Sequence, residues 1–472
     1  MRGMLSNLGI AYWTCEWLIR IVMLVVAPVR RPPYAARSWL LLIFFLPIPG
    51  LLLYAAIGRP RFPRWRAARF LHLEPFFSDI ASRLIAAEAR SGRVTQEGAS
   101  ALVRKLGSMP AVGGNSVEFL DDYESVIDRL VMDIDSARHH VRLLVYIFAD
   151  DATGRRVIDA LGRAVIRGVA CHTLIDSVGS HHWARGTTAL LRNAGVEVRE
   201  SLPFHWLRGR TRRDMRNHRK LFLIDGTIGY AGSQNIVAKD FRPGVSNREL
   251  MARVTGPVVA EMTAIFLADW YLETETMLSQ SVDIPPSNGG TVTAQLLPSG
   301  ADYPLEGFET LLVWQIHRAR QRVVIITPYF IPDEDLLGAM RTAVLRGVEV
   351  DLVVSAIEDQ KLVSLAQRSY YEDLLETGIR IHRFRKYLLH AKNVSIDGEL
   401  AIIGSSNVDI RSFQLNEEVS LVLLDPPAVA TLEGIQRACL AESDRIDLEE
   451  WRHRSTRQKI GENMARLVSP LL

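Results

Sequence analysis

The chain has 472 residues, enough for two or three domains with sizeable cores, and 48% of its residues are apolar while 23% are charged. A net charge of +3 is too small to indicate a nucleic-acid partner. The three cysteines lie far apart, at Cys15, Cys171 and Cys439, which excludes a disulfide framework and a zinc-ligand spacing. We therefore expect the catalytic part in a reducing compartment.

Two apolar stretches near the N-terminus predict a membrane anchor over residues 1–68. Residues 8–29 are apolar apart from Glu16 and Arg20, which are four apart and can pair on one helical face. Residues 38–58 carry no charge and are long enough to cross a hydrocarbon core of ~30 Å. Two prolines and a glycine at 47–50 leave two arrangements open, a second crossing or a re-entrant loop.

Arginines follow both apolar stretches. The larger group follows the second stretch, and an excess of arginine marks the cytoplasmic side of a membrane protein. We expect a protein of the cytoplasmic (inner) membrane, multi-pass or re-entrant, with its catalytic lobes in the cytoplasm. The arginines are Arg30, Arg31 and Arg37 after the first stretch and Arg59, Arg61, Arg64, Arg66 and Arg69 after the second.

Beyond residue ~70 the pattern alternates between strands and helices, which predicts an α/β fold. The segment "HHVRLLVYIFADD" reads as a strand, and the helix that follows it ends at Gly168. The segment "QRVVIITPYFIPDEDL" begins a second strand and helix in the same order, and that helix ends at Gly347. A linker rich in Pro, Ser, Asn and Gly separates the two at 281–292. We interpret this as an internal duplication, with lobes at 113–280 and 293–472.

The clearest signal is a motif that occurs once in each half. It reads H-x-K-x4-D-G and is followed by G-S-x-N, with 17 residues from His to Asn in both copies (235 − 218 and 407 − 390). Two copies with identical offsets do not arise by chance. The residues are His218, Lys220, Asp225, Ser233 and Asn235 in the first copy and His390, Lys392, Asp397, Ser405 and Asn407 in the second.

The spacing of the motif predicts how each copy folds. Residues two apart on a strand face the same side, so each histidine lies beside its lysine. Asp-Gly between apolar runs predicts a hairpin, and a two-residue turn sets Ser233 opposite His218 and Ser405 opposite His390. Each half thus gathers His, Lys, Ser and Asn at one strand end. The aspartates remain at the turns, where we expect them to be structural.

These two clusters suit phosphodiester chemistry. Lysines with Ser and Asn donors can hold phosphate oxygens from both sides. One neutral histidine can attack phosphorus, while a second, protonated, can deliver a proton to the leaving oxygen. The pattern predicts two displacements through a phosphohistidine, with no metal and no cofactor. Two satisfied core histidines are the alternative, which leaves the neighbouring lysines unexplained.

The two motifs resemble the paired HKD motifs of the phospholipase D superfamily. The resemblance implies two pseudo-twofold-related α/β/α lobes with the active site between them, and places the six His, Lys and Asp residues of the motifs in it. Similarity extends to bacterial cardiolipin synthases, through "TPYFIPDEDL", "QRSYYEDLLETGIRIHRF", "GSSNVDIRSFQLNEEVSL", the terminal "ARLVSPLL" and the N-terminal "SWLLLIFFLPIPGLLLYAAIGRPR".

The same resemblance implies individual roles. An acidic residue after each motif orients the catalytic histidine in the superfamily, and Glu249 and Glu418 stand at matching places, with Glu417 adjacent to the second. The histidine of the first motif is the usual nucleophile, which would be His218, with His390 as acid and base. The pseudo-symmetry leaves the reverse assignment open.

Residues 203–216, "PFHWLRGRTRRDMR", interleave aromatic residues with arginines. Such a segment suits an anionic lipid surface, and a solvated charged loop is the alternative.

The function expected from this resemblance is that of a cardiolipin synthase. It would transfer a phosphatidyl group between two phosphatidylglycerols, giving cardiolipin and glycerol through a phosphatidyl-histidine. The partners would be phosphatidylglycerol, other anionic phospholipids and the membrane. A membrane-bound phospholipase D that hydrolyses phospholipid to phosphatidic acid is the alternative. A nuclease would need a basic groove instead of an anchor, and a non-catalytic scaffold would show decay in a motif.

Overall fold

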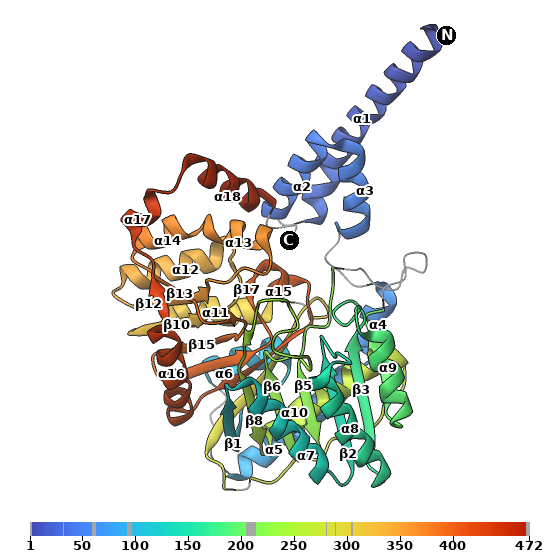
Figure 1. The fold of residues 1–472 in the computed structure, drawn as a ribbon, viewed down its shortest axis with the longest axis vertical. Coiled ribbons are helices and arrows are strands. Elements are labelled where there is room, and N and C mark those ends of the chain that lie inside the picture. The colour runs from blue at the N-terminus through green and yellow to red at the C-terminus, as the bar shows by residue number, and fades with distance from the viewer. Residues whose placement is uncertain are drawn as a thin grey trace.

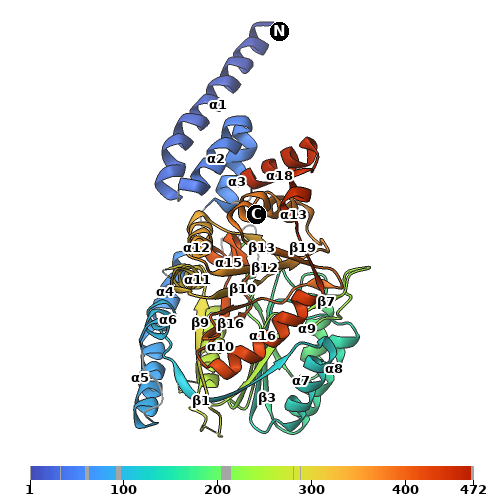
Figure 2. The same ribbon diagram turned by 90° about the vertical axis from the view of Figure 1, so that its left-hand side faces the viewer.

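A single mixed β-sheet of 15 strands runs through the computed structural model, with helices on both faces (Figures 1 and 2). The structure describes residues 2–31, 33–58, 63–91, 97–203, 214–279, 281–287, 289–303 and 305–468. The strand order is β19-β13-β12-β10-β15-β16-β18-β9-β1-β8-β6-β5-β2-β3-β4. The strands of the second half of the chain therefore form one side of the sheet, and those of the first half form the other side. The halves meet where β9 pairs antiparallel with β1.

The first half carries strands and helices in the order that the alternating pattern predicts. Its elements are β1 (Val112–Leu120), α7 (Tyr123–Ser136), β2 (His140–Val145), α8 (Ala152–Ile166), β3 (Ala170–Asp176), α9 (Ala184–Asn193), β4 (Glu197–Ser201), β5 (Leu221–Ile224), β6 (Ile228–Gly232), β7 (Asn247–Arg248), β8 (Met251–Thr255) and α10 (Val258–Thr274).

The second half repeats this order. Its elements are β9 (Val292–Ser299), α11 (Gly307–Arg318), β10 (Arg322–Ile326), β11 (Phe330–Ile331), α12 (Glu334–Leu345), β12 (Glu349–Ser355), α13 (Lys361–Arg368), α14 (Tyr371–Thr377), β13 (Arg380–Phe384), β14 (Leu388–Leu389), β15 (Asn393–Ile396), β16 (Leu400–Gly404), β17 (Val408–Asp409), α15 (Ile410–Gln414), β18 (Glu418–Leu423), α16 (Pro426–Ala441), β19 (Ser443–Arg445), α17 (Leu448–Arg452) and α18 (Thr456–Val468).

Equivalent residues begin and end equivalent helices in the two halves. The carboxylates of Asp151 and Asp333 accept the backbone N–H three residues on and cap α8 and α12. Gly168 and Gly347 follow these helices with φ of +88° each, a left-handed conformation that glycine adopts without strain. The predicted helix ends at the two glycines are confirmed.

The two motif hairpins form with a register one residue away from the one expected. Strands β5 and β6 pair Leu221 with Ala231, where a two-residue turn would pair Leu221 with Tyr230. The second hairpin pairs Asn393 with Ile403, which is the same shift. Asp-Gly does form both turns, with positive φ at each Asp and each Gly. The extra residue before the second strand moves both serines away from their expected partners.

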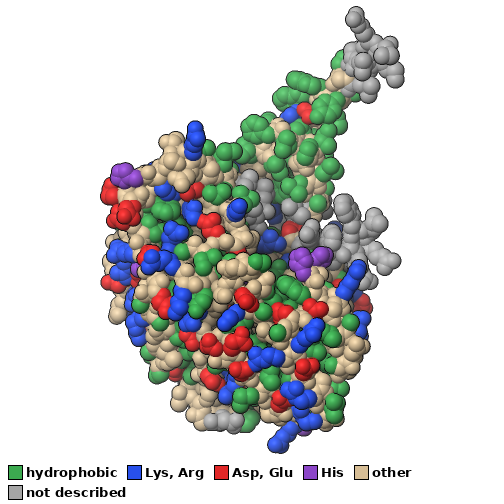
Figure 3. All heavy atoms as spheres, viewed as in Figure 1, with side chains coloured by type: hydrophobic (Ala, Val, Ile, Leu, Met, Phe, Trp, Pro, Cys, Tyr) green, Lys and Arg blue, Asp and Glu red, His purple; other side chains and the backbone are tan. Residues whose placement is uncertain are grey.

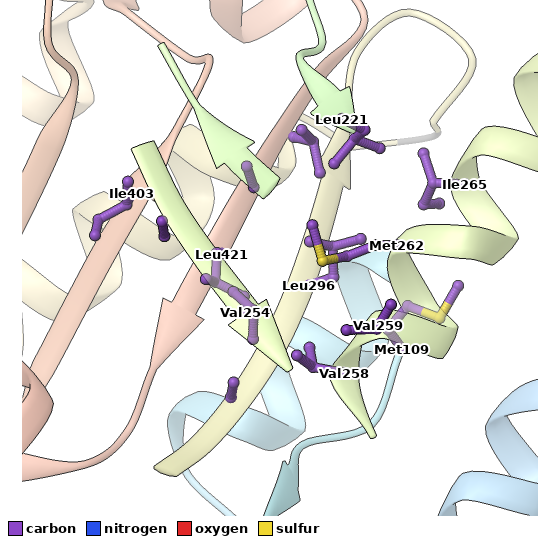
Figure 4. Close-up of a cluster of buried hydrophobic side chains, with 14 of the residues drawn as sticks. Met109, Leu221, Val254, Val258, Val259, Met262, Ile265, Leu296, Ile403 and Leu421 are labelled. Carbon is purple, nitrogen blue, oxygen red and sulfur yellow. The ribbon is translucent and has the colours of Figure 1, made fainter. Parts of the chain in front are cut away.

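Helix α10 holds the two sides of the sheet together. Its described side chains from Val258 to Trp270 are all buried, and a helix with no polar face requires cover on every side. Figure 4 shows Met262 and Ile265 of α10 beside Leu221 of β5, Leu296 of β9 and Leu421 of β18, which belong to one buried cluster. The core therefore crosses from one half of the chain to the other.

The N-terminal region forms three apolar helices, α1 (Arg2–Arg30), α2 (Pro33–Phe45) and α3 (Pro47–Ile57), which project from one end of the body (Figure 1). Gly9–Arg30 is long and apolar enough to cross a membrane, by length and composition alone. On the face seen in Figure 3, apolar side chains make up most of the described surface of this projection. The second apolar stretch is not one helix: it is divided at Leu46, before the two prolines.

Within α1, Arg20 and Glu16 form the expected i,i+4 ion pair at 3.3 Å. Helices α4 (Arg64–Leu71), α5 (Glu74–Ser91) and α6 (Ala99–Gly107) follow the apolar helices and pack on the body, with α6 against β9 and α11. Arg66 of α4 is fully buried there. This arginine is therefore part of the protein interior, and the arginine group expected at the membrane surface is smaller than the sequence suggested.

Candidate active site

A pocket opens between the two halves at the strand ends where the motifs lie. Both motif histidines line it, together with both motif asparagines. The remaining lining residues are Tyr146, Ile147, Arg216, Phe241, Arg242, Asn247, Tyr329, Ile331, Gln360, Val363, Asp409, Ile410, Arg411 and Asn416. Polar groups therefore surround the histidines, and apolar side chains of α13 and α15 stand among them.

Each histidine is paired with a carboxylate from the opposite half. The Nδ1 of His218 lies 3.0 Å from Glu418 Oε1, and the Nδ1 of His390 lies 2.7 Å from Glu249 Oε1. Glu417, the neighbour that left the second assignment ambiguous, contacts Arg219 instead. The partner of His218 is therefore Glu418 and not Glu417. Each histidine pairs with the glutamate that follows the motif of the other half.

The backbone enforces this exchange. The N–H of His218 donates to the carbonyl of Glu417 at 2.8 Å, and that of His390 donates to the carbonyl of Arg248 at 2.8 Å. Strand β14, just before His390, pairs in parallel with β7 of the first half. Each histidine is therefore anchored to the segment that carries its carboxylate, so the two halves form the site jointly.

The carboxylates determine which nitrogen of each ring faces the pocket. Burial alone would raise the pKa values of Glu418 and Glu249, but the neighbouring imidazoles outweigh it and lower both, so each side chain is ionised and can only accept. Each Nδ1 must carry the proton. Burial lowers the pKa of His218 to about 4 and also lowers that of His390. Both rings are therefore neutral in the resting site, with the Nε2 lone pair free to react.

The two motif lysines lie beneath the histidines, where both are buried and neither is among the residues that line the pocket. The Nζ of Lys220 donates to the carbonyl of His218 at 2.6 Å, and that of Lys392 donates to the carbonyl of His390 at 2.5 Å. Burial lowers the pKa of Lys220 to about 7 and that of Lys392 to about 8, and the charge of Lys392 lowers the pKa of Lys220 further by repulsion. An anion in the pocket would relieve this repulsion.

An aromatic ring distinguishes the two histidines. The ring of Tyr146 meets that of His218 edge to face, with centroids 4.8 Å apart, and Lys220 Nζ lies 5.2 Å from the Tyr146 ring centre. Counting back from the capping aspartates of α8 and α12, the residue equivalent to Tyr146 is Pro328. The environment of His218 thus differs from that of His390.

The motif serines do not lie where the hairpin geometry placed them. The Oγ of Ser233 donates to the carbonyl of Leu250 at 3.2 Å and accepts its N–H at 3.0 Å. The Oγ of Ser405 does the same with Val419, at 3.4 Å and 3.0 Å. Each serine therefore fixes the backbone of the residue that follows a histidine-binding glutamate, Glu249 or Glu418, and neither serine lines the pocket. Asn235 and Asn407 do line it, although Asn235 Oδ1 already accepts the N–H of Ile147 at 3.0 Å.

The motif aspartates lie at the opposite ends of the hairpin strands. Asp225 accepts the backbone N–H groups of Arg138, His139 and His140 at 2.8–2.9 Å. Asp397 does the same for residues 320–322 at 2.7–2.9 Å. Because each aspartate fixes the entry to a strand at the end of the hairpin away from the histidines, we propose structural roles for both.

A buried charge network that the sequence analysis missed adjoins His218. Arg219 contacts Asp269 at 2.5 Å and Glu417 at 2.7 Å. Arg66 of α4 contacts Glu273 at 2.7 Å and Asp302 at 3.0 Å. Burial and the nearby carboxylate of Asp302 raise the pKa of Glu417, while Arg219 and Arg66 oppose that rise. The sequence did contain a signal for this network: Arg219 stands between His218 and Lys220, whereas the second motif has Ala391 at the equivalent position.

The aromatic and basic segment at 203–216 falls partly outside the described residues. Residues 204–213, with Phe204 and Trp206, belong to that undescribed part. Arg216 is buried, donates to the carbonyl of Leu202 and lies 3.4 Å from Asp176, while lining the pocket. It is therefore part of the site wall.

Among the described residues, one group of acidic side chains could hold a metal ion: Glu309, Asp333 and Asp335. None of the three lines the pocket.

The pKa values predict a bell-shaped dependence of kcat/KM on pH. Attack requires neutral His218, so activity should fall as the pH drops toward about 4. Phosphate binding requires charged lysines, so activity should also fall as the pH rises through about 7 to 8. The profile can be measured in mixed micelles from about pH 4 to about pH 10. In Lys392→Met the alkaline limb of the residual activity should move upward, because Lys220 loses a repelling neighbour. A flat alkaline limb would contradict these lysine roles.

Known proteins share this sequence pattern and this fold. The family model described as "Cardiolipin synthase, PLD-like domain" matches residues 130–270 and 312–438. Cardiolipin synthase A of Erwinia tasmaniensis is 35% identical over 479 residues, covering 98% of this chain and 97% of the relative. That of Serratia proteamaculans is 35% identical over 478 residues with the same coverage. The crystal structure of phosphatidylserine synthase from Haemophilus influenzae is similar in fold, with a TM-score of 0.60 at 14% identity over 80% of this chain and 100% of that one.

Proposed function

Because the chain belongs to the cardiolipin synthase family of phospholipase D-like proteins, we propose that it joins two phosphatidylglycerols into cardiolipin and releases glycerol. The observation that carries the proposal is the pair of crossed His–Glu contacts in one pocket. This arrangement directs the Nε2 atoms of both imidazoles away from the carboxylates, so that one Nε2 can attack phosphorus and the other can carry the proton of the leaving or entering oxygen.

In the first step, Nε2 of His218 attacks the phosphorus of one phosphatidylglycerol. When the lipid binds, its phosphate anion raises the pKa of His390, and Nε2 of that ring takes up a proton from solvent. The P–O bond to the headgroup glycerol then breaks, and His390 gives this proton to the departing oxygen and becomes neutral. The ring of His218 becomes cationic on phosphorylation, and the Glu418 carboxylate at 3.0 Å stabilises that charge. Lys220 and Lys392 neutralise the equatorial oxygens.

In the second step, His390 takes the proton from a hydroxyl of the second phosphatidylglycerol. The alkoxide oxygen attacks phosphorus, the P–N bond to His218 breaks, and cardiolipin forms. Bonds and protons balance, since one phosphodiester replaces another. The reverse assignment of the two histidines gives the same products. We assign His218 as the nucleophile because it belongs to the first motif, as the resemblance implies.

Transfer to lipid should exceed transfer to water. A hydroxyl held in position has an effective molarity of ~10⁵ M or more, which outweighs bulk water. Purified protein in detergent with phosphatidylglycerol alone should therefore give cardiolipin and glycerol in near-equal amounts, with little phosphatidic acid, when products are measured by mass spectrometry. Excess glycerol should drive the reaction backward. Phosphatidic acid as the main product at every lipid concentration would instead identify a hydrolase.

We also propose that α1–α3 anchor the protein in the cytoplasmic membrane with both halves on the cytoplasmic side. The supporting observations are the apolar helix Gly9–Arg30, the arginines after each apolar stretch and the unpaired cysteines. Figures 1 and 2 both place α2 and α3 at the end of the body where α13 lies, and Val363 of α13 lines the pocket. The pocket would then open near lipid headgroups.

A further inference from the structure

Two asparagines occupy equivalent positions beside the two histidines. Asn247 stands two residues before Glu249, and Asn416 stands two residues before Glu418, so each half contains N-x-E. Both asparagines line the pocket, although their exposed fractions are only 7% and 6%. The proposed reaction steps assign neither of them a role.

The amide oxygen of each asparagine lacks a partner. Within the described part of the chain, Oδ1 of Asn247 and Oδ1 of Asn416 are buried and accept no hydrogen bond. For Asn247 the orientation of the amide is determined, because its Nδ2 lies 3.2 Å from Glu249 Oε1 and a carboxylate can only accept. The atom left unsatisfied is therefore an acceptor, in a residue of the pocket wall.

A buried acceptor without a partner is costly, and such groups persist where a ligand supplies the missing hydrogen bond. A phosphodiester cannot supply it, because its oxygens carry no hydrogen. The lysines and Arg216 provide the donors that suit phosphate. Acceptors suit the other part of the substrate, the hydroxyl groups of an alcohol. The donors, Arg216 in the pocket wall and the two lysines beneath the histidines, thus match the phosphate of a phosphoglycerol headgroup, and the acceptors in the wall match its hydroxyls.

We propose that the amide oxygens of Asn247 and Asn416 accept hydrogen bonds from headgroup hydroxyls and so select alcohols with several hydroxyls. The inference rests on the proposed function, because it needs an alcohol that leaves or enters. Asn247 pairs with Leu388, and the N–H of His390 donates to the carbonyl of Arg248. A hydroxyl bound at Asn247 therefore lies beside the base that handles its proton.

The test is a competition between two alcohols. The full-length enzyme in detergent receives phosphatidylglycerol with equal amounts of isotope-labelled glycerol and 1-propanol, which lacks the additional hydroxyls. The ratio of labelled phosphatidylglycerol to phosphatidylpropanol should exceed about tenfold for the unaltered enzyme, since a site built to bind hydroxyls rejects analogues without them. In Asn247→Leu and in Asn416→Leu this ratio should fall about tenfold or more.

A matched control is Asn193→Leu at the exposed end of α9, which should keep the original ratio. If a leucine variant does not fold, the alanine variant is measured in the same way and should show the same fall. An unchanged ratio in folded variants, or equal loss of both products, would overturn this inference alone. If the unaltered enzyme transfers to neither alcohol, the proposed function fails and the inference fails with it.

Discussion

Replacing His218 or His390 with alanine should each lower kcat by about 10⁴-fold or more, because each ring performs a step that the other cannot perform at the same time. The fold should remain intact, since both side chains border a pocket. Activity is measured as cardiolipin formation from phosphatidylglycerol, and folding by the melting temperature. Near-normal turnover in either variant would contradict a mechanism with two histidines.

A substrate with a better leaving group separates the two roles. A phosphodiester of p-nitrophenol needs no acid to expel its leaving group, so His390→Ala should still release about one equivalent of p-nitrophenolate and then stop. His218→Ala should release none, because no phosphohistidine can form. A burst from His218→Ala but not from His390→Ala would reverse the assignment of nucleophile and acid.

Replacing Glu418 or Glu249 with glutamine should lower kcat by about 10³- to 10⁴-fold. The carboxylate holds the imidazole with its proton on Nδ1 and stabilises the cationic ring, and an amide of the same shape does neither reliably. The contacts at 3.0 Å and 2.7 Å make this effect specific to one histidine each. Single-turnover measurements should show slow phosphohistidine formation in Glu418→Gln and slow proton transfer to a poor leaving group in Glu249→Gln.

The neighbouring residue offers a matched control. Glu417 is as deeply buried as Glu418, but its side chain contacts Arg219. Glutamine at position 417 leaves the contact between His218 and Glu418 in place, so Glu417→Gln should change kcat of the folded protein by less than about tenfold. A loss in Glu417→Gln as large as in Glu418→Gln would mean that general disruption, and not the contact with His218, explains the result.

The duplicated motif was sufficient to predict much of the site. Identical offsets in two copies identify the residues, and strand and hairpin geometry places each histidine over its lysine and each aspartate at a turn. The helix ends at Gly168 and Gly347 follow from local conformation alone. Local rules were less accurate for the hairpin register, where one extra residue in each turn displaced Ser233 and Ser405 from their expected positions.

The sequence by itself determined the chemistry: two His–Lys motifs, an α/β duplication and an apolar N-terminal region, because motif identity and periodicity are local properties of the chain. Only the tertiary structure decided that His218 binds Glu418 and His390 binds Glu249, contacts that span 200 and 141 residues. It also placed Arg66 of the N-terminal region in the interior. These contacts depend on the antiparallel pairing of β9 with β1 and on α10, which bring the two halves together, and no local pattern encodes that pairing.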